Sequence, residues 1–163
     1  MNSYTPTGNE NETWNADVDD NGSIKCYRIG TTLIIAGNGS GKIAANENSM
    51  RWATQDAVNA FSKVTTFTGL NLLDVSNVKD FSGMLACFAS LTSLDLSSWD
   101  VSNGEAFQQM FYNCTKLNSI NCSNWNMSKA TDLYAMFYNC TALTSLNLLQ
   151  WDVSNVTCME ALF

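Results

Sequence analysis

The chain has 163 residues, of which 45% are hydrophobic and 14% are charged, and its formal net charge is -7. This composition predicts a folded chain with a sizeable core, and the negative charge disfavours nucleic acid and anionic membranes as partners. The chain contains no histidine, which removes the commonest general base and the commonest metal ligand. No stretch approaches the roughly 20 apolar residues of a membrane span.

The first segment, residues 1–13, reads MNSYTPTGNENET and is polar and acidic. It has neither the basic start nor the apolar run of a secretory leader, so we expect a flexible or attachment segment. We expect residues 14–63 to form an N-terminal cap with a β-hairpin and a helix. Residues 64–163 are expected to hold four repeats, the last of them incomplete.

The sequence DVDDNGSI is similar to the start of a calcium-binding loop. Asp17, Asp19 and Asn21 fall at the first, third and fifth positions of an EF-hand. The twelfth position should carry a bidentate glutamate, but it is Arg28, and no helical pattern flanks the segment. Because Asp-Asn-Gly between strands is a strong hairpin turn, we interpret the segment as a turn and its three residues as a weak calcium candidate.

The sequence AGNGSGK is one residue away from a nucleotide-binding loop. Ala36 replaces the first glycine of that motif, Gly41 and Lys42 match it, and Ile43 replaces the hydroxyl residue that would bind magnesium. We therefore predict a strand from Thr32 to Ala36 that ends in a glycine-rich turn, and no cofactor.

A 26-residue repeat occupies most of the remaining chain. LTSLDLSSWDVSN begins at Leu91, LNSINCSNWNMSK at Leu117 and LTSLNLLQWDVSN at Leu143, and a degenerate copy precedes them. In the first half of each copy apolar residues alternate with polar ones, which predicts a short strand.

The second half of each copy has a different period. Its apolar residues recur at i, i+3, i+4 and i+7, which predicts a short amphipathic helix. A serine precedes each of these apolar stripes, where its side chain can cap a helix. The stripes are Phe81, Met84, Leu85 and Phe88; Phe107, Met110, Phe111 and Cys114; and Leu133, Met136, Phe137 and Cys140.

Neither half of a copy can bury its apolar side alone. The predicted fold class is therefore an α/β solenoid of 26-residue coils, each with a short parallel strand and a short helix, behind an N-terminal β-hairpin and helix cap. Trp99, Trp125 and Trp151 recur at one position of the repeat and are expected in the core rather than on a ligand-stacking platform.

Six cysteines are spread over the chain without a C-x-x-C motif or a paired framework. We therefore expect no zinc site. Cys114 and Cys140 hold equivalent positions of the repeat and are interpreted as buried free thiols. A disulfide between them would need Cα atoms within about 7 Å.

The repeat, with its LTSLDLSSWDVSN core and a following MFYNC, resembles the 26-residue surface-protein repeat of BspA-like leucine-rich-repeat proteins. The resemblance implies a leucine-rich-repeat-like fold in a bacterial surface or extracellular protein that acts in adhesion. The segment from Asn21 to Ile43 is similar to the hairpin that precedes such repeats. Gly104 and Ala130 replace the usual valine and Lys129 the usual asparagine, so we expect the middle helices to start less firmly.

Two functions from different classes remain. One is a non-catalytic surface module that binds a protein or glycan partner on a host or cell surface. The alternative is a structural component of a phage virion, such as a head or tail fibre module. An enzyme is not expected, because nothing converges around the carboxylate pairs Asp17–Asp19 and Glu105–Asp132.

The candidate partner-binding residues are the outward positions of the predicted strands. They form ladders of hydroxyl, amide and carboxylate groups, for which a solvated face without a specific site is the alternative interpretation. These residues are Ser93, Asp95, Ser119, Asn121, Ser145 and Asn147.

The sequence stops at Phe163, within an apolar stripe whose earlier copies continue to a cysteine. Stacked repeats need caps that cover the apolar side of the last copy. We therefore expect further repeats, self-association or another chain to cover that end.

Overall fold

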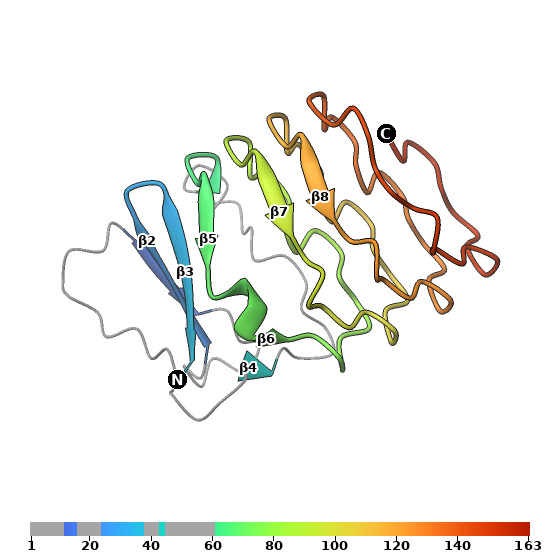
Figure 1. Ribbon diagram of the computed structural model, residues 1–163, viewed down its shortest axis with the longest axis horizontal. Helices are drawn as coiled ribbons and strands as arrows, with labels where there is room; N and C mark the ends of the chain where they lie inside the picture. Colours follow the sequence, from blue (N-terminus) through green and yellow to red (C-terminus); the bar gives the residue numbers. More distant parts are fainter. Residues whose placement is uncertain (1–11, 16–23, 38–42, 45–60) are drawn as a thin grey trace.

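The computed structural model describes residues 12–15, 24–37, 43–44 and 61–163. Its elements follow one another along the long axis of the molecule, with strands β2 and β3 at one end and the carboxyl terminus at the other (Figure 1). The elements are β1 (Glu12–Asn15), β2 (Ile24–Ile29), β3 (Thr32–Gly37), β4 (Ile43–Ala44), β5 (Thr66–Thr68), the 3-10 helix η1 (Leu70–Leu72), β6 (Leu73–Asp74), β7 (Ser93–Asp95) and β8 (Ser119–Asn121).

The strands form three small sheets. The first has the order β1-β2-β3-β5, in which β1–β2 and β2–β3 are antiparallel and β3–β5 is parallel. β4 pairs in parallel with β6, and β7 pairs in parallel with β8. The strand predicted from Thr32 to Ala36 is confirmed as β3, and it forms a hairpin with β2. The predicted glycine-rich turn and the predicted cap helix fall within residues 38–42 and 45–60, outside the described residues.

The predicted fold class, an α/β solenoid with a strand and a helix in every coil, is wrong. The three apolar stripes predicted to be helical form turns, at residues 82–87, 108–113 and 134–139. Within the described residues the only helical element with given bounds is η1. The sheets have two or four strands, and residues 145–147 form no strand at all.

The backbone hydrogen bonds of the stripes explain why they are not helical. In an α-helix each N–H bonds the carbonyl four residues earlier. Here the N–H of Gln109 donates to the carbonyl of Tyr134 at 2.8 Å, in the next copy of the repeat, and the N–H of Met110 donates to Phe107 at 3.3 Å and closes a turn. The alternate residues that donate to the next copy are Phe81, Gly83, Leu85, Cys87, Phe107, Gln109, Phe111, Asn113, Leu133, Ala135 and Phe137.

Left-handed backbone recurs at fixed positions of these turns. Gln109 and Ala135 have φ of 56° and 51°, and Gly83 holds the same position one copy earlier with φ of 64°. Asn113 and Asn139 repeat the conformation four residues further on, with φ of 59° and 60°. Left-handed backbone costs roughly 1–2 kcal/mol for each residue other than glycine, so the hydrogen bonds to the next copy must offset that cost.

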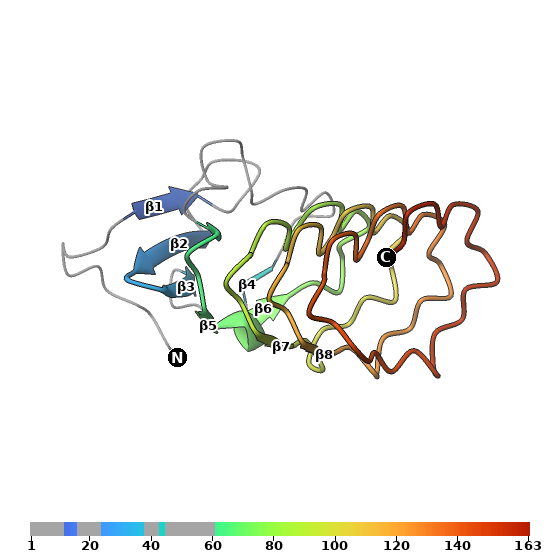
Figure 2. The same ribbon diagram turned by 90° about the horizontal axis from the view of Figure 1, so that it is seen from above.

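Four repeat units can be defined by the 26-residue offset: residues 65–90, 91–116, 117–142 and 143–163. Their backbones follow similar paths and lie side by side (Figures 1 and 2). On one side, here called the strand side, the β7–β8 pairing places Ser93 opposite Ser119. On the other side, here called the turn side, parallel bridges join the four units. They link Asp80 to Ala106, Ala106 to Asp132, and Asp132 to Cys158.

The core lies between the strand side and the turn side of the units. Phe81, Met84, Phe107 and Met110 are fully buried although their stripes are not helical, because consecutive turns also bring residues at this spacing to one side. Phe81 stacks on Phe107 with ring centroids 4.9 Å apart, and Phe111 stacks on the equivalent ring of the third unit at 5.3 Å.

The tryptophans join neighbouring units through their indole N–H groups. The prediction that they lie in the core is confirmed for Trp99 and Trp125, which are buried, while Trp151 is half-buried. Each indole donates to a carbonyl of the preceding unit, and Trp125 also stacks on Trp151 at 6.0 Å. The acceptors are Leu70 at 3.1 Å, Leu96 at 3.2 Å and Cys122 at 3.3 Å.

Gly104 is one of the positions at which the repeat departs from the family pattern, and the structure explains why it is not a valine. A Cβ at this glycine would lie 2.4 Å from Cζ of Phe107, so the ring occupies the space that a valine would need. Lys129 donates to the side-chain oxygen of Asn103 at 2.7 Å and thereby links the third unit to the second.

The serines that were predicted to cap helices lie in side-chain turns instead. The backbone N–H of Ser102 donates to Oδ1 of Asp100 at 3.0 Å, two residues earlier. Such a bond mimics a backbone turn and needs no helix to follow. The equivalent pairs are Ser76 with Asp74, Ser128 with Asn126, and Ser154 with Asp152.

Gly69 connects β5 to η1 at a point where no side chain fits. Its φ is 89°, and a Cβ would lie 2.5 Å from the carbonyl oxygen of Ile35 in β3. We predict that Gly69→Ala lowers the free energy of unfolding by more than about 2 kcal/mol, because left-handed strain and the clash add together. Urea denaturation followed by tryptophan fluorescence measures this loss.

Gly30 in the β2–β3 turn provides the matched control. It also has left-handed backbone, with φ of 58°, but a Cβ there would meet nothing within 4 Å. Gly30→Ala should therefore cost only the backbone strain, about 1 kcal/mol. An equal loss of unfolding free energy in Gly69→Ala and Gly30→Ala would show that the clash with the carbonyl oxygen of Ile35 adds nothing to the cost at Gly69.

Candidate functional site

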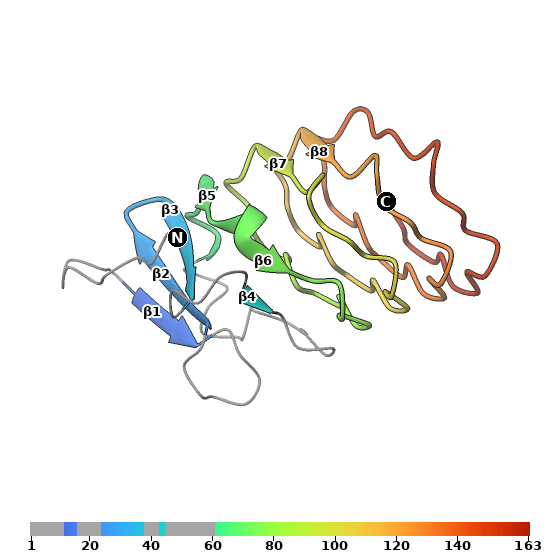
Figure 3. The same cartoon turned by 60° about the horizontal axis from the view of Figure 1, so that its bottom comes forward.

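The six residues predicted to bind a partner are exposed, and we call them together the polar face. The β7–β8 register brings Ser93 opposite Ser119 and Asp95 opposite Asn121, so the structure unites these four residues. Figure 3 shows β7 and β8 adjacent on one side of the molecule. The two remaining residues, Ser145 and Asn147, hold the same positions in the fourth unit but belong to no strand.

Hydrogen bonds hold the side chains of Asp95 and Asn121, two residues of the polar face, in place. Oδ1 of Asp95 accepts from the backbone N–H of Ser97 and from Nδ2 of Asn121, both at 3.1 Å. The side-chain oxygens of Ser123 and Asn121 lie 3.1 Å apart. Hydrogen bonds from the hydroxyl and N–H of Ser97, and a further one from Asn121, hold the pKa of Asp95 below its usual value. Asp95 is therefore ionised at neutral pH.

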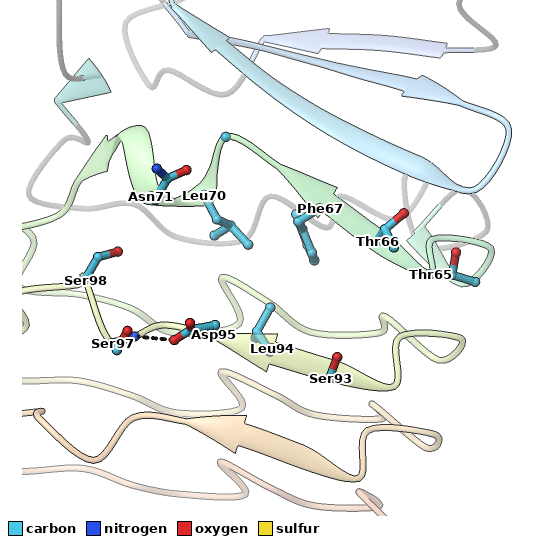
Figure 4. A pocket seen from close by; sticks show the side chains of 11 residues that line it. Thr65, Thr66, Phe67, Leu70, Asn71, Ser93, Leu94, Asp95, Ser97 and Ser98 are labelled. Atoms are coloured by element: carbon cyan, nitrogen blue, oxygen red, sulfur yellow. Dashed lines mark hydrogen bonds between the residues drawn. The ribbon is translucent and has the colours of Figure 1, made fainter. Parts of the chain in front are cut away.

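A pocket of about 470 Å³ opens between the first and second units on the strand side (Figure 4). β5 pairs with β3, and β7 pairs with β8, but within the described residues no sheet joins β5 to β7. The pocket lies at this interruption. Its lining residues are Thr65, Thr66, Phe67, Gly69, Leu70, Asn71, Ser93, Leu94, Asp95, Ser97 and Ser98.

Only part of this pocket was predicted from the sequence. Ser93 and Asp95 of the polar face line it, whereas Ser119, Asn121, Ser145 and Asn147 do not. The residues that β5 and η1 contribute were not predicted, because the first copy of the repeat is degenerate. The available signal was a change of phase: position 68, equivalent to Leu94, holds a threonine, and the apolar residue Phe67 stands one position earlier.

The pocket has apolar and polar parts. Phe67, Leu70 and Leu94 point into the space between β5 and β7 (Figure 4). Phe67 is half-buried and its ring lies 4.9 Å from that of Phe88. Within the described part of the chain, Asp95 is the only charged residue of the lining and no basic side chain contributes to it.

The sequence motifs for metal and nucleotide binding fall mostly outside the described residues. Asp17, Asp19 and Asn21, the weak calcium candidates, lie there, and so do the matching residues of the glycine-rich loop. Arg28, at the twelfth position of the EF-hand comparison, lies in β2 and is buried. Among the residues that the structure describes, no group of three acidic, cysteine or histidine side chains could hold a metal ion.

Glu105 and Asp132, the carboxylate residues that the sequence offered as a pair, lie in neighbouring units on the turn side. Asp132 accepts from Nε2 of Gln108 at 2.6 Å and from the backbone N–H of Tyr134 at 2.8 Å. Its carboxylate is therefore part of a turn. Glu105 is exposed on the same side, where its backbone carbonyl accepts from Thr131.

The structure shows free thiols at Cys114 and Cys140, as predicted, and also at Cys87, Cys122 and Cys158. Cys114 and Cys140 donate to carbonyl oxygens of the preceding unit, Leu85 at 3.2 Å and Phe111 at 3.1 Å. Burial raises the pKa of Cys114, and it raises the pKa of Cys122 and of Cys140 to about 11. These three thiols stay protonated at neutral pH and are poor nucleophiles.

The raised pKa values predict a loss of stability in alkali. In the unfolded chain a thiol ionises near pH 8.5. In the folded protein Cys122 and Cys140 ionise near 11. Between these values the unfolded chain binds fewer protons than the folded one, so the free energy of unfolding falls as the pH rises. The contribution of these thiols to the free energy of unfolding should stay constant below about pH 8.5 and decline above it. Thermal unfolding measured from pH 7 to 11 tests this.

The double variant Cys122→Ala/Cys140→Ala separates this effect from the titration of tyrosine and lysine. It should unfold more easily at neutral pH, because it loses buried atoms, but its stability should depend less on pH in the alkaline range. An equally steep alkaline decline in the variant would show that other groups cause it.

No helix within the described part of the chain has the length and apolar character needed to cross a membrane. A family model with the description "Mycoplasma protein of unknown function, DUF285" matches residues 47–163. No curated protein and no solved structure matches the chain.

Proposed function

The chain belongs to the DUF285 family, whose description gives no function, and we propose that the protein is a non-catalytic binding module displayed at a bacterial surface or outside the cell. Its partner is a protein or a glycan on a host or cell surface. The observation that carries this proposal is the polar face, where exposed hydroxyl, amide and carboxylate groups of two paired strands lie side by side.

The sequence supports the same location and role. The LTSLDLSSWDVSN core and the following MFYNC resemble BspA-like surface proteins, for which adhesion is the implied activity. The strand-and-helix coil that the resemblance also implied is not part of the proposal. The absence of histidine and the protonated state of Cys114, Cys122 and Cys140 support a binding role rather than a catalytic one.

The polar face is suited to binding because the side chains of Asp95 and Asn121 are already held by hydrogen bonds. The hydrogen bonds from Ser97 and Asn121 to Asp95 fix the carboxylate before a partner arrives. Binding then costs less side-chain entropy, which reaches about 0.5–1.5 kcal/mol for each side chain immobilised on association.

Alanine substitutions on the polar face test the proposal. The variant with Ser93, Asp95, Ser119 and Asn121 all changed to alanine should bind at least about tenfold more weakly to its partner on glycan or host-protein arrays, because each lost hydrogen bond contributes about 1 kcal/mol. The control is the variant Glu105→Ala/Glu160→Ala, which removes two exposed carboxylates of the turn side and should leave binding unchanged. Unchanged binding in the polar-face variant would exclude this face as the site.

A second surface suited to a partner is the outer side of the fourth unit. Val153 is 37% exposed and Phe163 is 67% exposed, whereas the equivalent Val101 and Phe137 are each 1% exposed beneath the following unit. Met159, 43% exposed, is likewise equivalent to the buried residues Leu133 and Phe107. We propose that another copy of the chain covers this outer side when the 163-residue chain is studied alone.

This proposal predicts concentration-dependent association. Sedimentation velocity should show a species larger than the monomer as the concentration of the chain rises, and Val153→Ser/Phe163→Ser should move the equilibrium toward the monomer because less apolar area is buried. A monodisperse monomer at high concentration would contradict the proposal. The substitution Ile29→Ser, at an exposed apolar residue of β2, is the control and should leave the equilibrium unchanged.

A further inference from the structure

The pocket between β5 and β7 exists because the two strands are out of phase. The inward residue of β5 is Phe67 and that of β7 is Leu94, so they are 27 residues apart, whereas β7 and β8 pair at an offset of 26. After β5 the chain turns at Gly69, with left-handed backbone, into η1. Among the described residues no backbone hydrogen bond joins β5 to β7, and side chains of both segments line the space between them.

The pocket has two polar sides, one formed by η1 and the other by β7 and the residues that follow it. Both sides carry side chains that can form hydrogen bonds to a ligand. Within the described residues, the side chains of Asn71, Ser93 and Ser98 have no hydrogen-bond partner, and all three line the pocket. Asp95 uses Oδ1 for its bonds to Ser97 and Asn121. Because a carboxylate has two oxygens with about four acceptor positions, Asp95 can accept further hydrogen bonds.

The floor of the pocket is apolar. The half-buried ring of Phe67 lies between the two polar sides of the pocket, with Leu70 and Leu94 beside it (Figure 4). A sugar ring has the matching chemistry, because its C–H groups form an apolar face while its hydroxyl groups project from the rim as donors and acceptors. The volume of about 470 Å³ lies within the range of small-ligand sites, roughly 300–1,000 Å³.

The charge of the pocket distinguishes between classes of ligand. Among the lining residues that the structure describes, Asp95 is the only charged one and is ionised, and the chain as a whole has a net charge of -7. A phosphate, sulfate or carboxylate group would meet repulsion there and find no lysine or arginine among these described residues. The chemistry therefore matches an uncharged, hydroxyl-rich ligand.

We propose that the pocket between β5 and β7 binds a segment of neutral saccharide, with a sugar ring on Phe67 and its hydroxyl groups bonded to Asn71, Ser93 and Asp95. This inference rests on the proposed binding function and narrows its partner to a neutral glycan. It also places the specific contacts at the first and second units rather than along the whole polar face.

The test begins with the intact chain on an array of defined neutral oligosaccharides, including glucans, galactans, mannans and oligomers of N-acetylglucosamine. Sialylated and sulfated glycans and a set of host proteins are included. The strongest neutral binder is then titrated by calorimetry. We expect binding to neutral glycans, and at least about tenfold weaker binding to the anionic counterpart of the same oligosaccharide.

Two matched substitutions locate the site. Ser93→Tyr places a ring in the pocket and should weaken binding at least about tenfold, whereas Asn124→Tyr, at an exposed position outside both the pocket and the polar face, should leave it unchanged. Both residues are exposed, so equal thermal stability of the two variants verifies that they fold. Asp95→Asn should narrow the preference for neutral over anionic glycans by about two- to fivefold, because the carboxylate charge is exposed and screened.

The outcomes separate this inference from the proposed function. Glycan binding that Ser119→Tyr abolishes and Ser93→Tyr spares would overturn the pocket site but leave the polar face as a binding surface. Binding to host proteins alone, or a preference for anionic glycans, would overturn the saccharide assignment and leave the binding function. Failure to bind any glycan or protein on the arrays would overturn both.

Discussion

Backbone hydrogen bonds between neighbouring units are the interaction on which the rest of the structure depends. On the turn side, alternate N–H groups donate to the next unit, and the groups between them close short turns. Each such bond contributes about 1 kcal/mol net, and together they fix the left-handed residues that an isolated unit would not adopt. Phenylalanine stacking and the tryptophan indole bonds also join neighbouring units, so packing and backbone pairing support each other.

The two sides of the units differ, and this difference creates the candidate site. Backbone bonds join all four units on the turn side, from Lys79 to Leu162. On the strand side only β7 and β8 pair among the four units. The strand side can therefore display side chains and open a pocket next to β5 without losing the bonds that hold neighbouring units together.

The sequence predicted which residues are buried better than it predicted their backbone. Spacing at i, i+3, i+4 and i+7 identified Phe81, Met84, Phe107 and Met110 as inward residues, and they are buried. The same spacing is compatible with consecutive turns, so it could not exclude them. A glycine such as Gly83 is compatible with left-handed backbone, but the equivalent residues Gln109 and Ala135 gave no such signal in the sequence. The pocket depends on one shifted residue in a degenerate copy, which periodicity alone does not reveal.

The most direct test of the bonds between units is the NMR measurement of couplings across hydrogen bonds, from amide nitrogen to carbonyl carbon. The structure predicts a coupling from the nitrogen of Gln109 to the carbonyl of Tyr134, and another from Phe111 to Met136, each joining one unit to the next. Coupling of Gln109 to the carbonyl of Glu105, four residues earlier, would show an α-helix and contradict this account.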